Sequence, residues 1–450
     1  MAWLLAGITS AMQPARLPLA LLAVALLAAL VSVVDRADGG RYGARGLGGG
    51  ELTEFEVRQL RQRARNAVLG IGAAEVAELE SADGGRDADE IPLAAFRDAA
   101  RRGADAARER IVARELDAES RDAALGAVQS SLVSAMRALD AADPKGVASA
   151  FVDDEIRAAR EVVTGIVRLD ADAALGGIVA MIALVPIAAI SAAPVAFPLG
   201  AVVALPLLSI LWGALARMAA IHAGRDGRLS PFEGAAFARA RAVGLASIPL
   251  LPLALLALLA AVIAVFALLL RIPVVGAVAG LLLVIPLAVA LLGAILGLVA
   301  LVALPIMPAA LAVEDCDAGD AITRAAALVL GRPLLVAGSL AASVAALALG
   351  AAIVGTAVGV ADASFAALAS RIGGDVGRAL ASRDPAEIAS LGGAARLTAS
   401  LAGFWISVLS ALPAAYLVSL AADLSTRLYL LLRARADGEP PATIAGHGLG

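Results

Sequence analysis

The sequence predicts an all-α integral membrane protein with about seven transmembrane helices, within a range of about six to eight, and an inserted soluble helical domain. The 450-residue chain is 60% hydrophobic and only 17% charged, whereas soluble domains are nearer half apolar and about a quarter charged. Residues 35–172 hold 20 of the 36 basic and 27 of the 40 acidic side chains. The rest of the chain contains uncharged apolar runs long enough to cross a bilayer.

The scarcity of cysteine and histidine removes several classes of site. A single cysteine forms no intrachain disulfide. Two histidines, His222 and His447, are too few for a histidine-based zinc centre or catalytic triad. We therefore expect no cofactor and no metal. The net charge of −4, without a basic stripe, argues against nucleic acid as a partner.

The N-terminal region, 1–34, carries the first predicted span at 17–34. This stretch could instead be the apolar core of a signal peptide, but no small-x-small cleavage pattern follows it, so an uncleaved anchor is favoured. Residues 35–51 include "GARGLGGG", which lacks the Lys-Ser/Thr ending of a phosphate-binding loop. We interpret this segment as a Gly-rich linker.

A soluble helical domain is expected over 52–172. Its first helix begins with a capping-box pattern, Thr53 followed by Glu56, and its apolar residues recur at helical spacing. Further helices are predicted near 92–116, 119–141 and 150–170. This domain is the expected contact for a membrane or cytoplasmic protein partner.

The polytopic domain is expected over 173–432, and the tail 433–450 is expected to be disordered. The run 272–313 has 42 residues, about 63 Å as one helix, so it must fold back, re-enter or kink at its prolines. Proline, glycine and polar residues divide the other apolar runs. The remaining spans are predicted at 175–193, 197–221, 243–270, 334–361 and 397–424.

The stretch 311–333, "LAVEDCDAGDAITRAAALVLGRP", gathers four acids around Cys316. An EF-hand loop would need glycine and glutamate at the positions that Asp320 and Ala326 occupy, so the calcium interpretation fails. An amphipathic helix over 317–332 fits instead, with Asp317 as N-cap. The candidate contacts to a lipid headgroup or partner are Asp317, Asp320, Arg324 and Arg332, with Arg225 and Asp226 from the preceding polar loop.

Ionisable residues inside the apolar runs are few. Asp423 and Arg427 lie four residues apart in the last run, the spacing of a helical ion pair. They are the best candidates for a polar contact within the bundle. A half-solvated terminal pair is favoured over a proton or ion relay, and both interpretations stay open.

Arginine-rich loops stay in the cytoplasm. The loop 222–242, the stretch 311–333 and the C-terminal end all carry arginines, which predicts that they are cytoplasmic. Counting seven spans then predicts that 52–172 is cytoplasmic as well, in a cell inner membrane. Arg16 before the first span does not fit this orientation, because it would hold the N-terminus inside.

Four blocks carry a resemblance to a known family: "ARMAAIHAGRDGRL", "RIPVVGAVAGLLL", "AVEDCDAGDAITRAAALVLGRP" and "RLYLLLRARADGEP". Over roughly 210–440 the chain resembles an uncharacterised family of bacterial polytopic membrane proteins and, more distantly, the membrane domain attached to some glycerophosphodiester phosphodiesterases. It departs from the family pattern at Gly227, Asp315 and Gly319. The residues that match the family pattern are Arg217, Arg225, Asp226, Glu314, Asp317, Asp320, Arg324 and Arg332. The resemblance implies a multi-pass membrane location and no particular activity.

Three functions are compatible with these patterns. A large membrane region without convergent catalytic residues favours a non-enzymatic scaffold or subunit of a membrane assembly, with the lipid bilayer and a protein as partners. A transporter or permease is the alternative, because broken helices such as 272–313 often mark transport sites. A membrane-embedded lipid enzyme is least favoured, since the cytoplasmic acids and arginines would have to form its whole site.

Overall fold

The computed structural model describes residues 2–43, 46–82, 91, 93–114, 117–168, 170–225, 227–272, 280, 282–382, 388 and 391–438. These segments are predominantly helical. They form no named strand, only isolated bridges that pair Tyr42 with Glu51 and with Lys145. The helical character predicted from the sequence is therefore confirmed for the described part of the chain.

Six helices among the described residues are long and apolar enough to cross a membrane. Most of their apolar surface is not covered by protein, as suits helices that contact lipid tails. Six is the lower end of the predicted range. The candidates are α2 (Leu17–Asp38), α10 (Ala196–Arg225), α12 (Ala242–Leu269), α14 (Val284–Ala303), α17 (Pro333–Ile372) and α20 (Gly393–Asp437).

The predicted span at 175–193 is not among these candidates. Its residues form α8 (Ala171–Val179), a π-helical segment at Ala180–Leu184 and α9 (Val185–Ala192). This stretch packs back against α7 (Val147–Arg168). Hydropathy alone suggested a span here, but the π segment interrupts the helix, and contacts with α7 cover part of it.

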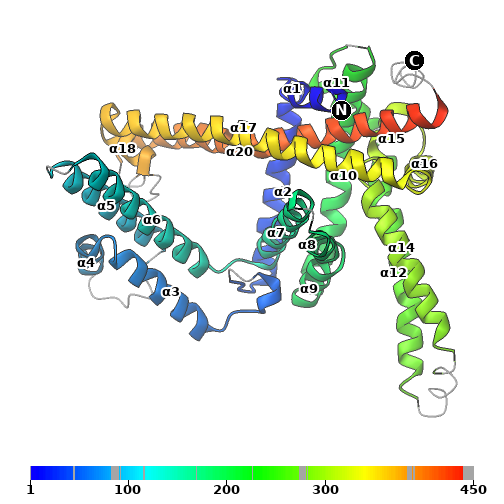
Figure 1. Cartoon of the computed structure of the whole chain (residues 1–450), viewed down its shortest axis with the longest axis horizontal. Coiled ribbons are helices and arrows are strands. Elements are labelled where there is room, and N and C mark those ends of the chain that lie inside the picture. Colours follow the sequence, from blue (N-terminus) through cyan, green and yellow to red (C-terminus); the bar gives the residue numbers. More distant parts are fainter. Residues whose placement is uncertain are drawn as a thin grey trace.

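The helices α2 and α10 lie side by side and run in opposite directions (Figure 1). At one end, Arg16 donates a hydrogen bond to the backbone carbonyl of Met218, at 3.4 Å. At the other end, a Cβ added to Gly200 would lie 2.5 Å from the side chain of Val34. The domain inserted between α2 and α10 therefore leaves and rejoins the bundle at the Val34 end.

The long apolar run 272–313 is broken, as its prolines predicted. The helices α12 and α14 form a hairpin, and the chain then turns at residues 304–306 into α15 (Met307–Glu314). Pro308 lies in the first turn of α15, where proline is tolerated. The break at Pro273 lies outside the described residues.

The last two candidates are longer than predicted. α17 has 40 residues and α20 has 45, so each is about 60 Å long or more, twice the hydrocarbon thickness. They pair along their length and lie across α2 and α10 (Figure 1). The six candidates therefore do not share one direction.

The main hydrophobic core lies at the end of α2 and α10 that Arg16 occupies. Its centre is α15, in which every residue from Met307 to Val313 is buried. The final turns of α20 and one face of α16 (Ala318–Gly331) pack around it. Short α11 (Pro231–Ala240) closes the same end.

The described part of the inserted domain is helical, as the patterns of 52–172 predict. Both halves of the predicted Thr53–Glu56 capping box are present at the start of its first helix. Its helices are α3 (Glu54–Leu69), α4 (Ala73–Ala82), α5 (Leu93–Val112), α6 (Ala118–Ala142) and α7.

One side chain at the end of α2 fixes the inserted domain to the bundle. Asp35 accepts hydrogen bonds from the backbone N–H groups of Ala148, at 2.7 Å, and Ser149, at 3.2 Å. It thereby caps the N-terminus of α7 from another helix. The start of α7 is held at the Val34 end of the α2–α10 pair.

This connection separates the inserted domain from the C-terminal end of the chain. The domain joins the α2–α10 pair at the Val34 end, whereas the last turns of α20 pack at the Arg16 end. If α2 and α10 cross a bilayer, the two regions lie on opposite sides of it. The predicted shared cytoplasmic side for 52–172 and the C-terminus does not fit this arrangement, because the count of seven spans included 175–193.

Candidate functional site

The most heavily buried charges in the described structure form one network. Asp423 on α20 lies between two arginines: its Oδ1 is 2.5 Å from Nη1 of Arg16, and its Oδ2 is 2.6 Å from Nε of Arg427. The side chains of Arg16 and Asp423 are fully buried, and that of Arg427 is 5% exposed. We refer to these three residues as the Arg16–Asp423–Arg427 network.

The N-terminal helix α1 (Ala2–Ser10) covers this network. The hydroxyl of Ser10 accepts a hydrogen bond from Arg427, at 3.3 Å. A Cβ added to Gly7 would lie 3.0 Å from Oδ2 of Asp423, so a larger residue there would press on the carboxylate. Two side chains of α20 also bind the backbone of this region, Tyr416 at Ile8 and Ser419 at Ala11.

The network combines two formal positive charges with one negative charge. A lone buried arginine would be very costly, and a shared carboxylate lowers that cost for both guanidinium groups. The Met218 carbonyl takes a further N–H of Arg16, whereas its Nε is buried without a partner among the described atoms. The arrangement binds α1, α2, α10 and α20 into one unit.

The structure thus places the predicted pair, Asp423 and Arg427, in contact and inside the protein. It is not a half-solvated terminal pair. The helical spacing identified these two residues, but no pattern around Arg16 predicts that it completes their network. From the sequence alone, Arg16 is only a charge that does not fit the predicted orientation.

A second charged cluster surrounds Glu314, at the end of α15. Its carboxylate pairs with Arg324 of α16 and with Arg433 of α20, the latter at 3.1 Å, and accepts a hydrogen bond from the Tyr429 hydroxyl. The Glu314 side chain is 13% exposed. Three helices therefore meet on one carboxylate.

The residues that follow Glu314 adopt the predicted helix start. Asp317 caps α16 by accepting a hydrogen bond from the backbone N–H of Asp320, at 2.8 Å. Asp315 has a positive φ of 53°, and its carboxylate pairs with Arg241, at 2.7 Å. The four acids are thus distributed over a helix end, a turn and a cap.

The described members of the predicted headgroup set are distributed along α16, from its N-cap to its C-cap. Arg324 is engaged with Glu314, and its contact with Asp320 is 4.0 Å. Arg332 is exposed beyond the end of α16. Asp226 and the side chain of Arg225 lie outside the described residues. Of the members that the structure describes, Asp320 and Arg324 are brought together with Asp317.

Cys316, the only cysteine, is half-buried among these acids. Burial, with a smaller contribution from the neighbouring aspartates, raises the pKa of the thiol above its ordinary value. A raised pKa lowers the fraction of reactive thiolate. The geometry gives this cysteine no nucleophilic role.

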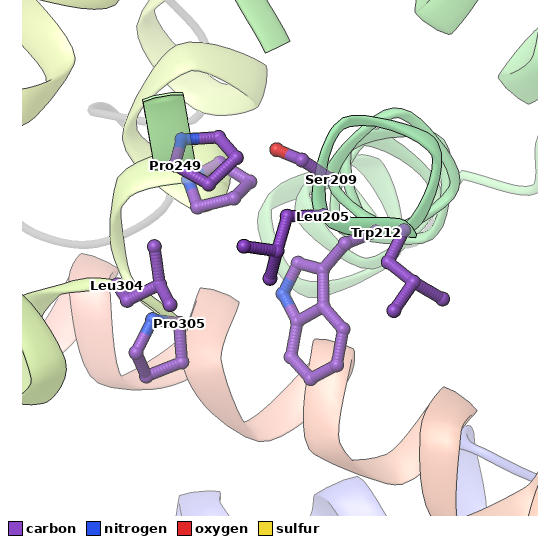
Figure 2. Close-up of a pocket in the computed structure, with 8 residues that line it drawn as sticks. Leu205, Ser209, Trp212, Pro249, Leu304 and Pro305 are labelled. Carbon is purple, nitrogen blue, oxygen red and sulfur yellow. The ribbon is translucent and has the colours of Figure 1, made fainter. Parts of the chain in front are cut away.

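An apolar pocket lies beside the break between α14 and α15, with a volume of about 200 Å³. Figure 2 shows the rings of Pro249 and Pro305 and the side chains of Leu205 and Leu304 around it. The polar groups at its wall form hydrogen bonds with other groups of the protein. The Ser209 hydroxyl donates to the Leu245 carbonyl, at 2.6 Å, and the Trp212 N–H donates to Ser425, at 3.3 Å.

A second apolar pocket of about 260 Å³ lies between α12, α14 and α16. Ile322 and Ala326, from the predicted apolar face of α16, line it. The one hydroxyl at this wall, that of Thr323, donates to the carbonyls of Gly319 and Asp320 within its own helix. Both pockets therefore offer apolar walls to a ligand.

No group of three or more His, Cys, Asp or Glu side chains suited to a metal ion occurs among the described residues. Comparison of the chain with models of protein families, with curated proteins and with solved structures gave no significant match. The family resemblance of residues 210–440 therefore stays an expectation drawn from the sequence.

Proposed function

We propose that this chain is a multi-pass inner-membrane protein that acts without catalysis, as a scaffold or subunit of a membrane assembly. One observation supports this more than any other. Buried charges of the bundle pair with each other, in the Arg16–Asp423–Arg427 network and around Glu314. They stabilise contacts between helices and leave apolar walls in both pockets of the bundle.

The proposed orientation follows from the arginines. Arg241, Arg324 and Arg433 lie at the Arg16 end of the bundle, and short arginine-bearing loops favour the cytoplasm. We therefore place this end in the cytoplasm and the inserted domain on the opposite side. The arginines of the domain do not oppose this, because long translocated segments do not obey the rule.

The test is extraction of the full chain from its native membrane in lipid nanodiscs, followed by mass spectrometry of the captured proteins. We expect one partner protein at constant stoichiometry in independent preparations. An unrelated multi-pass protein captured in the same way controls for chance co-extraction. Recovery of the chain alone would contradict the scaffold proposal.

Transport is the second candidate, and the break at residues 304–306 beside the apolar pocket favours it. Discontinuous helices can bind substrates at exposed backbone groups. Solute or ion flux in reconstituted vesicles that is lost in Pro305→Ala, at the break itself, would support transport. Vesicles without flux would leave the scaffold proposal as the better one.

A further inference from the structure

A basic cavity of about 360 Å³ lies in the inserted domain, between α6 and α7. Four cationic side chains line it: Arg137 from α6, Lys145 from the connection, and Arg157 and Arg160 from α7. Asp153 is the acid at its wall. The lining side chains therefore carry a formal excess of positive charge.

Part of that charge is neutralised locally and part is not. Lys145 pairs with Asp153, and Arg157 pairs with Asp154 at 2.6 Å. Among the side chains that the structure describes, none forms an ion pair with Arg137 or Arg160. Two guanidinium groups on different helices are thus free to hold a common anion, and their planar N–H groups suit phosphate oxygens.

The backbone at two glycines forms another part of the cavity wall. Gly43 and Gly46 line it, and Gly46 has a positive φ of 66°. A Cβ at Gly46 would collide with the carboxylate of Asp154, which accepts the backbone N–H of Leu47 at 2.8 Å. The chain therefore approaches α7 closely, and the cavity wall is held in place.

The cavity lies next to the end of α2. Lys145 pairs with Tyr42 through two backbone hydrogen bonds, at 2.8 and 2.9 Å. Ala150, which lines the cavity, belongs to the same buried cluster as Val34 near the end of α2. If α2 crosses the membrane, the cavity is close to the bilayer surface on that side.

We propose that this cavity binds the phosphate of an anionic phospholipid headgroup, with Arg137 and Arg160 as its principal contacts. Three features favour a lipid over a free phosphate ion: the volume, the position beside the end of α2, and Ile156, which lines the cavity and is 45% exposed. The isoleucine offers an apolar surface next to the charge. The proposal rests on the membrane location of α2 and is independent of any partner protein.

The test compares lipid binding to the full chain in detergent by native mass spectrometry. The probes are phosphatidylglycerol and phosphatidylcholine with the same acyl chains, added at equal concentration. We expect a preference for phosphatidylglycerol that Arg137→Gln with Arg160→Gln reduces about tenfold, as the loss of charge-assisted hydrogen bonds predicts. The double variant Arg102→Gln with Arg114→Gln removes the same charge elsewhere in the domain and should keep the preference.

Two results would overturn the proposal: equal binding of both lipids by the unaltered chain, or equal loss in the two double variants. Inorganic phosphate is then added to the unaltered chain as a competitor. Displacement of phosphatidylglycerol by millimolar phosphate, beyond the effect of sodium chloride at equal ionic strength, would assign the cavity to a free anion instead of a lipid. The phosphate competition uses only the unaltered chain, so it does not depend on the folding of any variant. Its outcome is also independent of whether a protein partner is found.

Discussion

Asp423 is the residue whose chemistry depends most on its neighbours. Its carboxylate is the counter-charge for two arginines, and all three side chains are shielded from solvent. Removing one partner from a buried ion pair leaves an uncompensated charge, whereas loss of an exposed pair costs little. The difference in stability between losing a buried and losing an exposed ion pair can be measured within this chain.

Asp423→Asn keeps the shape of the side chain and removes its charge. We expect a loss of about 3–5 kcal/mol in unfolding free energy, because Arg16 and Arg427 would then face each other without a carboxylate. Thermal unfolding in detergent measures the effect. Asp375→Asn, which disrupts an exposed pair with Arg378, is the matched control and should cost less than about 1 kcal/mol. Equal effects of the two variants would show that the network does not stabilise the bundle.

Glu155 on α7 makes a pH-dependent contribution to the free energy of unfolding. Burial, with repulsion from Asp154 as the second cause, raises its pKa from an ordinary 4.5 to about 7. The folded chain therefore keeps a proton that the unfolded chain releases between these two values. The stabilisation is complete below the lower pKa and is lost as the pH rises through the upper one.

Glu155→Gln should remove this pH dependence. We expect the variant to match the unaltered chain at about pH 4 and to exceed it by about 2 kcal/mol at about pH 8, since each unit of pKa shift corresponds to about 1.4 kcal/mol before screening. Thermal midpoints at the two pH values measure it. Glu161→Gln, at an exposed position of the same helix, should retain the original profile. A midpoint difference independent of pH would contradict the assignment.

Among the contacts of single residues, those between positions close in the sequence were predictable. The Thr53–Glu56 capping box and the Asp317 cap involve residues three positions apart, so the sequence was enough to predict them. Arg16 and Asp423 are separated by 407 positions. Their contact depends on how α2 and α20 cross, which no pattern within either segment encodes.

At the scale of helices, the cap of α7 is the least local feature. Asp35 belongs to α2 and satisfies backbone N–H groups that most helices satisfy with a residue of their own N-terminus. A sequence search for an N-cap at the start of α7 could not find it. The same side chain therefore serves as a cap and as a connection between the domain and the bundle.

Asp35→Ala should free the first turn of α7. We expect a loss of about 1–2 kcal/mol and faster hydrogen exchange at Ala148 and Ser149. Asp117→Ala, which removes an ordinary cap from α6, should accelerate exchange only at the start of α6. Unchanged exchange at α7 in the first variant would show that Asp35 does not fix this helix.

Apolar runs located helices correctly but were a poor guide to where a helix ends and to whether it can span a membrane. The run 175–193 is apolar enough to suggest a span, but the structure divides it at a π segment and packs it against α7. The predicted span ends at residue 361, whereas α17 continues to Ile372. Hydropathy reports which residues avoid water, and tertiary contacts decide where a helix ends.

For the whole molecule, the antiparallel α2–α10 pair determines which regions share a side. Two cysteine variants in a Cys316→Ser background test this: Ser130→Cys in the inserted domain and Ala436→Cys at the end of α20, both at exposed positions. In sealed cells, a membrane-impermeant maleimide should label Ser130→Cys, and it should label Ala436→Cys only after permeabilisation.

A denatured sample of each variant controls for reactivity of the introduced thiol. Labelling of both variants in sealed cells, or of neither, would contradict opposite sides for the domain and the C-terminus. Labelling of Ala436→Cys alone would support opposite sides and reverse the proposed orientation.

The Arg16–Asp423–Arg427 network also implies an order in which the helices assemble during synthesis. Arg16 is synthesised 407 residues before the carboxylate that neutralises it, and every other candidate span between them emerges first. The first candidate span must therefore stay beside an uncompensated arginine until residue 423 has been synthesised. A nascent chain that stops before residue 423 would lack the carboxylate that pairs with Arg16. The contacts between α2 and α20 would therefore form only after α20 has been synthesised.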